Sequence, residues 1–308
     1  MVPTEGLTIA PLGLDAITEG LALTVEAGWN QTSEDWAFFV SHGTVLGARD
    51  NAQRLLATAA VLPYSSGFAW VSLVIVAKSH RGRGLGTRML ERCLEILRQR
   101  SLVGMLDATP AGERIYAPLG FRPLFALERW EGAGGRMPAR ALAPGQGGVQ
   151  RFNPSELRRV CALDASAFGA DRGALLADFG ARDGALAFLL EDASGYAVAR
   201  RGRAASQVGP VVAPNEPRAV MLLHATIAAT SGEVFVDVPD RWTGIAASLR
   251  ALGFRSQRPF LRMALGSNSA YGDGGRIFAI GGAGVPCAAR RAVHRHRRDS
   301  PPSRRAAS

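Results

Sequence analysis

The pattern of apolar and polar positions predicts a buried strand that runs directly into an amphipathic helix near residue 80. Residues 71–76 are apolar at nearly every position, as in a central strand covered on both faces. After a short gap, apolar side chains recur at the i, i+3/i+4 spacing of a helix with one buried face: Met89, Leu90, Cys93, Leu94 and Leu97. The gap reads HRGRGLGT, so a loop rich in glycine and arginine should lie at this strand-to-helix junction.

A loop of this kind is suited to bind a phosphate group. Glycine adopts positive φ angles without strain and lets the backbone approach a ligand closely. The free N–H groups of the first helical turn then point at the anion, with the helix dipole behind them. Arg81 and Arg83 add positive potential without filling the space. A plain tight turn is the alternative, but three glycines and two arginines exceed what a turn requires, so we interpret the loop as a phosphate site.

Two well-known phosphate-binding loops, the Walker loop and the dinucleotide fingerprint, do not match the spacing of this segment. The Walker loop requires Gly-Lys-Ser/Thr, and GLGTRM contains no lysine. The dinucleotide fingerprint has an acid some way after its glycines, and Asp107 lies 21 residues after Gly86. However, GRGLG has the spacing G-x-G-x-G, and about 70 residues precede it, whereas the fingerprint usually follows the first strand of its domain. An NAD(P)-dependent oxidoreductase remains as an alternative.

The order of predicted elements occurs twice along the chain. Residues 131–150 are rich in Gly, Ala and Pro and are typical of a linker. On either side of them, strands and helices follow in the same order, and each copy ends in helix, Leu-Gly-Phe and strand. We therefore predict an α/β fold with two tandem domains, each a mixed, mostly antiparallel sheet flanked by helices. The predicted divisions are domains at 1–135 and 149–283, a linker at 136–148 and a basic tail at 284–308.

The segment LVIVAKSHRGRGLGTRML resembles the acetyl-CoA-binding motif of the GCN5-related N-acetyltransferase (GNAT) superfamily. Its pattern Arg/Gln-x-x-Gly-x-Gly/Ala is carried by Arg81, Gly84 and Gly86. The later segment ERIYAPLGFRP is similar to the superfamily's Tyr-x-x-x-Gly-Phe, carried by Tyr116, Gly120 and Phe121. The second half, with VGPVVAP and LGFRSQRPFLRM, resembles the degenerate C-terminal domain of tandem bacterial members, and the resemblance covers about residues 7–282.

This resemblance implies an N-acetyltransferase that moves an acetyl group from acetyl-CoA directly to a primary amine of a small molecule or peptide. It implies that backbone N–H groups hold the pyrophosphate of coenzyme A along Arg81, Gly82, Arg83, Gly84, Leu85, Gly86 and Thr87. It also implies that the pantetheine arm pairs with the backbone of Val74, Ile75 and Val76 beside a splay in the sheet. The second copy reads APNEPRAVMLL at the loop position, without a glycine, so we expect one cofactor per chain.

The catalytic groups follow from the same resemblance. Tyr116 matches the tyrosine that in this superfamily commonly donates a proton to the departing sulfur, and a tyrosine that only packs in the core is the alternative. Many members place a glutamate on the strand beside the acetyl group, but GFAWVSLVIVA contains no carboxylate. Ser72 or Asp35 acting through water remain candidate bases, Asp107 is a candidate ligand for a substrate ammonium, and none is preferred.

The segment GWNQTSEDWAFF, residues 28–39, falls where the superfamily has its acceptor-side loop. Its aromatic, amide and acidic side chains suit a cationic or amine substrate. The alternative is that its two tryptophans only cover the sheet. We predict acceptor contacts from this segment and from the acid near the end of the strand that follows the predicted helix. The residues are Trp29, Asn30, Gln31, Asp35, Trp36 and Asp107.

Most of the basic charge lies at one end of the sequence. The formal net charge is +10, but residues 285–308 alone contribute +6 in a segment rich in Arg, Pro and Ser. We expect this segment to be disordered and dispensable. The rest of the chain is mildly basic, so a nucleic-acid partner is not expected. A non-catalytic acyl-CoA-binding regulator, whose tail contacts nucleic acid or another partner, remains as a second alternative.

Other features of the sequence predict a cytoplasmic protein. No apolar run approaches the ~18–20 residues that span a bilayer, and the first residues lack the basic region of a signal peptide. The three cysteines share no metal-ligand spacing, so neither a metal site nor a disulfide is expected. The sequence pattern does not predict an oligomeric state.

Overall fold

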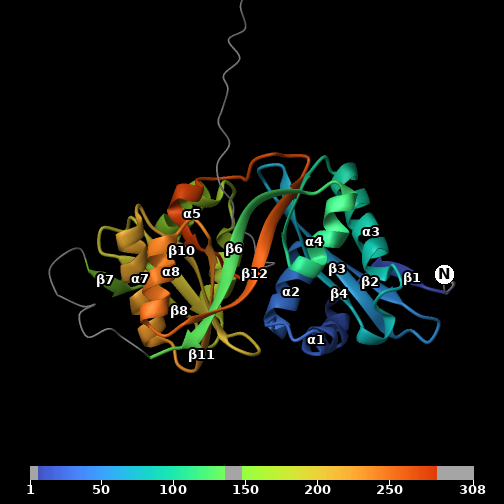
Figure 1. Ribbon diagram of the computed structural model, residues 1–308, viewed down its shortest axis with the longest axis horizontal. Helices are drawn as coiled ribbons and strands as arrows, with labels where there is room; N and C mark the ends of the chain where they lie inside the picture. The colour runs from blue at the N-terminus through green and yellow to red at the C-terminus, as the bar shows by residue number, and fades with distance from the viewer. Residues whose placement is uncertain (1–5, 136–147, 283–308) are drawn as a thin grey trace, which may run out of the picture.

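The computed structural model describes residues 6–135 and 148–282, and its helices flank a central sheet (Figure 1). The strands of the first half are β1 (Thr8–Pro11), β2 (Thr44–Arg49), β3 (Leu55–Tyr64), β4 (Phe68–Val76), β5 (Val103–Ala108) and β6 (Arg122–Ala133). Its helices are α1 (Ile17–Glu26), α2 (Ser33–His42), α3 (Leu85–Gln99) and α4 (Pro110–Tyr116). Short 3-10 helices lie at Leu14–Ala16, Lys78–His80 and Ala117–Leu119.

The second half repeats this order. Its strands are β7 (Val149–Arg151), β8 (Leu186–Leu190), β9 (Tyr196–Arg200), β10 (Ser206–Val212), β11 (Glu233–Pro239), β12 (Arg255–Leu265) and β13 (Ile277–Ala279). Its helices are α5 (Leu157–Phe168), α6 (Gly173–Ala181), α7 (Glu216–Ala229) and α8 (Thr243–Ala251), with 3-10 helices at Pro154–Glu156 and Gly274–Arg276. The predicted 136–148 linker and 284–308 tail fall almost wholly outside the described residues, as does the expected disorder of residues 285–308.

The predicted mixed sheet is confirmed, but its strands form one sheet where two were expected. It has 13 strands in the order β1-β2-β3-β4-β5-β12-β6-β11-β10-β9-β8-β7, with β13 paired to β10. The β4–β5 and β10–β11 pairs are parallel and the remaining neighbours are antiparallel. The buried strand and amphipathic helix predicted around residue 80 are β4 and α3, and α3 buries its apolar side chains against the sheet.

The two halves exchange one long strand each, β6 and β12. β6 belongs to the first repeat by sequence, yet it pairs with β11 of the second repeat, where Ala133 lies opposite Glu233. β12 belongs to the second repeat, yet it pairs with β5 of the first, where Arg262 lies opposite Asp107. The two exchanged strands also pair with each other, as the crossing ribbons in Figure 1 show. A boundary at residue 135 therefore separates the repeats in sequence but does not separate them in the sheet.

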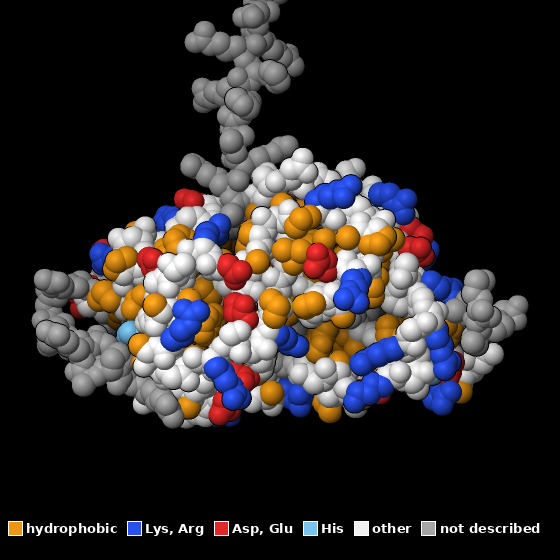
Figure 2. Space-filling view, in the orientation of Figure 1, with side chains coloured by type: hydrophobic (Ala, Val, Ile, Leu, Met, Phe, Trp, Pro, Cys, Tyr) orange, Lys and Arg blue, Asp and Glu red, His pale blue; other side chains and the backbone are white. Residues whose placement is uncertain are grey.

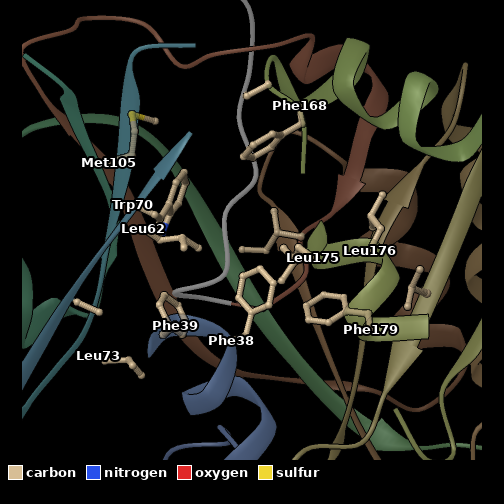
Figure 3. Close-up of a cluster of buried hydrophobic side chains, with 14 of the residues drawn as sticks. Phe38, Phe39, Leu62, Trp70, Leu73, Met105, Phe168, Leu175, Leu176 and Phe179 are labelled. Carbon is tan, nitrogen blue, oxygen red and sulfur yellow. The ribbon is translucent and has the colours of Figure 1, made fainter. Parts of the chain in front are cut away.

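Helices from both halves meet over one face of this sheet. Phe38 and Phe39 of α2 share a buried apolar cluster with Leu175 and Phe179 of α6. Figure 3 shows Phe38 facing Leu175 and Phe179 across the interval between the two halves. On the opposite face, α3 covers the first half, and α7 with α8 covers the second, each over a cluster of its own. Contact between the halves is thus made by both strands and helices.

A buried group of charges joins the same helices. Asp35, in the first turn of α2, is 2% exposed and accepts hydrogen bonds from Arg182 Nη1 at 2.7 Å and Arg200 Nη1 at 3.2 Å. It also completes the capping box of α2 with Thr32. Arg182 pairs in addition with Asp178 at 2.6 Å. Since both arginines come from the second half, the Asp35 carboxylate holds the two halves together.

The surface shows no segregation of charge on the side that Figure 2 presents. Basic side chains lie over both halves, with more of them on the first, and acidic side chains lie among them. Within the described residues, no helix is both long and apolar enough to cross a membrane.

We expect Asp35→Asn to lower the free energy of unfolding by roughly 3–5 kcal/mol, because it leaves buried arginines without their compensating charge. Asparagine keeps the size of the side chain and can still accept from the Thr32 N–H, so the change isolates the ionic part. Denaturant unfolding followed by circular dichroism measures the effect. Asp183→Asn, at an exposed pair with Arg201, is the matched control and should leave the midpoint nearly unchanged. Equal midpoints for the two variants would contradict this role of Asp35.

Candidate active site

The central strands β4 and β5 separate part-way along their length. They pair in parallel only from Phe68 to Trp70, which lie opposite residues 103–105. Beyond that point β4 carries a bulge, where Leu73 has a φ of 50° and its carbonyl accepts a hydrogen bond from Thr58 Oγ1 at 2.8 Å. The end of β4 therefore has no neighbouring strand on the β5 side, and a wedge-shaped opening results.

The glycine loop closes the far end of this opening. Gly82 and Gly84 have φ angles of 72° and 77°, a region that favours glycine. Gly84 is the N-cap residue of α3, which has no side-chain cap and no acid in its first turn. By contrast α2 and α4 are capped by Thr32 and Thr109. The first N–H groups of α3 are consequently left for a ligand.

A groove of about 1200 Å³ runs from this loop along β4 to α4, and we call it the splay groove. The predicted cofactor residues on its wall are Val74, Ile75, Val76, Arg81, Gly82, Gly84, Leu85, Gly86 and Thr87. Arg81 uses its Nε to bond the Val76 carbonyl at 2.9 Å, so it braces the end of β4. Arg83 is exposed and does not line the groove.

Tyr116 is the last residue of α4, and it lies at the inner end of the splay groove. Its ring packs over Gly112, where an added Cβ would come within 2.8 Å of the ring carbon Cε2. Thr109 holds the start of this short helix by accepting from the Gly112 N–H at 3.1 Å. Burial raises the pKa of Tyr116 to about 12, with a smaller contribution from Cys93. The phenol therefore stays protonated at neutral pH and can act as a proton donor.

A second space, which we call the inner cavity, reaches the same tyrosine from the other side. Its volume is about 670 Å³, and it lies between the two halves over the sheet. It shares part of its wall with the splay groove: Trp29, Val74, Asp107, Thr109 and Tyr116. Two molecules that entered by the two spaces would meet beside Tyr116 and Val74.

Some predicted acceptor residues lie on the wall of the inner cavity. Trp29 and Gln31 line it, and so does Ser72, which was predicted as a candidate base. Asn30 also lines it, but its carboxamide holds the β9–β10 loop, accepting from the Ala204 and Ala205 N–H groups and donating to the Ala205 carbonyl.

Other predicted acceptor residues are engaged within the protein. Asp107 lines both spaces, but Arg262 binds both of its oxygens at 2.7 and 2.9 Å, so it is not a free ligand for an ammonium ion. Asp35 and Trp36 require a correction. Asp35 lies in a helix, in the buried ion pairs described above, and Trp36 is 1% exposed and donates to Thr24. Neither lines the cavity, because their face of α2 packs inward.

Another part of the wall of the inner cavity comes from β6 and from strands of the second half, none of which sequence reasoning placed at the site. These residues are Arg129 on β6, Arg200 on β9, Gln207 on β10, and Arg258 and Phe260 on β12. The sequence contains a signal for two of them, since Arg200 ends and Gln207 lies near the start of a strand that is otherwise largely apolar. Arg129 and Arg258 lie among other polar residues of their strands, which gives no such signal. Only the strand exchange brings them beside Tyr116.

The second half has closed its own version of the splay. β10 and β11 pair in parallel at residues 206–208 and then separate, as β4 and β5 do. Here β13 fills the opening, with Ala279 opposite Val211 and Ile277 opposite Val212. Ile280, which directly follows β13, forms an isolated antiparallel β-bridge with Asp237 of β11.

The loop position of the second half is also occupied. Asn215 caps α7 by accepting from the Arg218 N–H at 3.1 Å. Glu216 is the first residue of that helix, and its carboxylate accepts from the Ile245 N–H at 2.9 Å. A capped helix start that carries an acid is unfavourable for a phosphate.

Comparisons with known proteins agree with this geometry. Residues 18–121 match a model described as "Acetyltransferase (GNAT) family", and residues 160–279 match one described as "Acetyltransferase (GNAT) domain". The chain therefore belongs to the GNAT superfamily, as a member with two such units in tandem. These matches do not favour the alternatives of an oxidoreductase or a non-catalytic regulator.

Individual relatives are distant. "Uncharacterized N-acetyltransferase YitH" of Bacillus subtilis (strain 168) is 24% identical over 76% of this chain and 83% of its own. "Holothin acyltransferase" of Pseudoalteromonas sp. (strain SANK 73390) is 26% identical over 73% and 76%. Among solved structures, a putative acetyltransferase from Pyrococcus horikoshii superposes with a TM-score of 0.74 at 22% identity, covering 91% of this chain and 96% of its own. A tandem GNAT protein from the clavulanic acid biosynthesis pathway gives 0.60 at 15% identity, covering 84% and 98%.

The raised pKa of Tyr116 should be visible in the stability of the protein at alkaline pH. The folded chain keeps this proton until about pH 12, whereas a tyrosine in the unfolded chain loses it near pH ~10. Stability should therefore be complete below pH ~10 and fall as the pH rises toward 12. Between pH 8 and pH 11, wild type should lose about 1.4 kcal/mol more unfolding free energy than Tyr116→Phe, as measured by urea titration. Equal losses would mean that the phenol is not held in its protonated form.

Proposed function

We propose that the chain is an N-acetyltransferase that uses acetyl-CoA and acetylates a primary amine. The observation that carries the proposal is the meeting of the splay groove and the inner cavity at Tyr116. A co-substrate along the groove and an acceptor in the cavity would bring their reactive ends to the same wall. Binding in two spaces that join at a proton donor is what direct transfer requires.

The splay groove fits acetyl-CoA along its length. The uncapped N-terminus of α3 suits the pyrophosphate, and each charge-assisted bond there contributes about 1.5–3 kcal/mol. The end of β4, free of β5 beyond Trp70, has backbone groups available for the amides of a pantetheine arm. When bound, acetyl-CoA supplies the activated acetyl group. We assign the polarisation of the thioester carbonyl to the backbone N–H of Val74, a residue beside the bulge that lines both spaces.

Tyr116 is the residue we assign to the leaving group. The transfer forms a bond from the amine nitrogen to the acetyl carbon and breaks the bond from that carbon to sulfur. The Tyr116 hydroxyl donates its proton to the sulfur, which leaves as a thiol. The tyrosinate is then reprotonated by solvent, and the surplus proton of the amine passes to water.

No free carboxylate lines either space among residues 6–135 and 148–282, since Asp107 is held by Arg262. The acceptor therefore reacts from its neutral amine form. The cavity assists this, because the arginines on its wall disfavour a positive charge on the bound amine. They therefore lower the pKa of its ammonium form.

The size and position of the inner cavity favour a small acceptor. It lies between the two halves, with strands of both in its wall, and the space that a ligand could occupy in it is small. The name of one relative, "Holothin acyltransferase", gives holothin as the acceptor of that protein. We therefore propose a small-molecule amine in preference to a peptide.

We expect Tyr116→Phe to lower kcat by roughly 10²–10⁴-fold, because the thiolate must then leave without its proton donor. Affinity for CoA should change little, since the splay groove keeps its shape. Thiol release from acetyl-CoA with an accepted amine measures kcat, and calorimetry measures CoA affinity. Tyr271→Phe is the control, as this tyrosine stacks on Phe68 and lines neither space. Wild-type turnover in Tyr116→Phe would return Tyr116 to a packing role.

Calorimetric titration should find one CoA bound per chain. The second splay is filled by β13, and the start of α7 is capped by Asn215. Gly84→Glu should abolish binding, because its side chain would enter the splay groove with a charge that repels phosphate. Nothing lies within 4 Å of a Cβ added at Gly84, so the variant should remain folded despite the strain of its φ. A stoichiometry of two, with one site surviving Gly84→Glu, would contradict this prediction.

A further inference from the structure

The inner cavity contains more hydrogen-bond donors than its own residues satisfy. The Nε–H groups of Arg200 and Arg258 and the side-chain amide nitrogen of Gln207 are buried without a partner among the described residues. The Arg200 side chain is 4% exposed and Gln207 is 1% exposed. A buried donor left without an acceptor costs about 1–3 kcal/mol. A ligand that accepts hydrogen bonds would satisfy these three groups.

The donors lie on one face of the exchanged sheet. Arg200 and Gln207 are opposite each other on β9 and β10. Arg258 is opposite Arg129 on β12 and β6, so two like charges face one another across neighbouring strands. Such a pair is unfavourable unless a negative charge lies beside it, and Asp237 supplies one charge for the two arginines.

The charges around the cavity leave one cation uncompensated. Arg129 is bound by both oxygens of Asp237, at 2.7 and 2.8 Å. Arg262 is bound in the same way by Asp107, and Arg200 shares Asp35 with Arg182. Among the described residues Arg258 forms no ion pair, and burial together with Arg129 lowers its pKa. A single negative charge on the ligand would compensate the positive charge of Arg258.

The cavity also has an unpaired acceptor. Gln31 Oε1 is buried and lacks a partner within the described part of the chain. Gln31 follows Trp29 and Asn30, and Trp29 lies on the wall shared with the splay groove. An N–H of the acceptor amine would satisfy this oxygen close to Tyr116.

We infer that the acceptor is a small amine that carries one carboxylate, with the carboxylate bound by Arg258, Arg200 and Gln207 and the amine directed to Gln31 and Tyr116. This inference rests on the proposed function and specifies its substrate class. It also revises the sequence-based expectation of a cationic acceptor, because the free charge of the cavity is positive. A carboxylate matches both the surplus of one charge and the planar geometry of guanidinium donors.

Matched pairs of amines test the inference. Aminobenzoate is compared with aminobenzamide, β-alanine with β-alaninamide, and spermidine serves as a cationic amine, each with acetyl-CoA and the full chain. The accepted carboxylate should exceed its carboxamide in kcat/KM by at least about 10-fold, since hydrogen bonds to a charged group carry that much discrimination. A preference for carboxamides or for spermidine would overturn the inference.

Variants on one strand show whether the cavity is responsible. Arg258→Gln should reduce the carboxylate preference to within about 3-fold, because the uncompensated charge is gone. Arg255→Gln, on the same strand but with a side chain that is 81% exposed, is the matched control and should keep the preference. A preference that survives Arg258→Gln would overturn the inference.

Failure of the proposed function would be distinguishable from failure of the inference. If the chain binds acetyl-CoA but acetylates no amine, the proposed activity falls. The carboxylate site is then judged by calorimetry of β-alanine and aminobenzoate with the CoA-loaded chain, a measurement that needs no turnover. Binding that is lost in Arg258→Gln and kept in Arg255→Gln supports the site, and absence of any carboxylate binding overturns it.

Discussion

The pairing of β12 between β5 and β6 is the constraint on which the rest of this structure depends. One long strand of each half, β6 or β12, pairs with a strand of the other half. The sheet is therefore continuous, and neither half has a complete sheet of its own. The exchange also determines the site, because Arg258 and Phe260 reach the inner cavity on β12 and Arg129 reaches it on β6. On one face of the sheet, the ion pairs of buried Asp35 and the packing of α2 against α6 also hold the two halves together.

The two repeats show how one backbone plan supports different roles. Both have a parallel strand pair that separates, but the first is open toward α3 and the second is filled by β13. The helix after the first splay begins at an uncapped glycine, and the helix after the second begins at a capping asparagine followed by an acid. The second half thus retains its packing while its polar groups are satisfied internally, and its remaining contribution is one wall of the inner cavity.

Buried arginines give that wall its chemical character. Arg129, Arg200 and Arg262 are each nearly inaccessible to solvent and each binds an aspartate. Their paired charges fix the positions of the side chains without leaving a free acid near Tyr116. The site therefore combines a rigid wall of paired charges with a phenol that burial keeps protonated. Arg258, which forms no ion pair among the described residues, is the basis for proposing an acceptor that carries an anionic group.

The sequence by itself determined what depends on neighbours along the chain. The apolar run of β4, the helical spacing of α3 and the glycines between them predicted the strand, the helix and the glycine loop at their junction, because φ preferences and periodicity are local properties. The splay beside this loop was expected only from the resemblance to the GNAT superfamily. The tertiary structure alone decided which strands lie side by side, since an antiparallel pair can form with any strand of matching pattern. It therefore placed Arg258, Arg200 and Gln207 beside Tyr116, and it turned Asp35 and Trp36 inward to packing and ion pairs. Contacts between residues more than a hundred positions apart leave no periodic signal, and only the folded sheet brings them together.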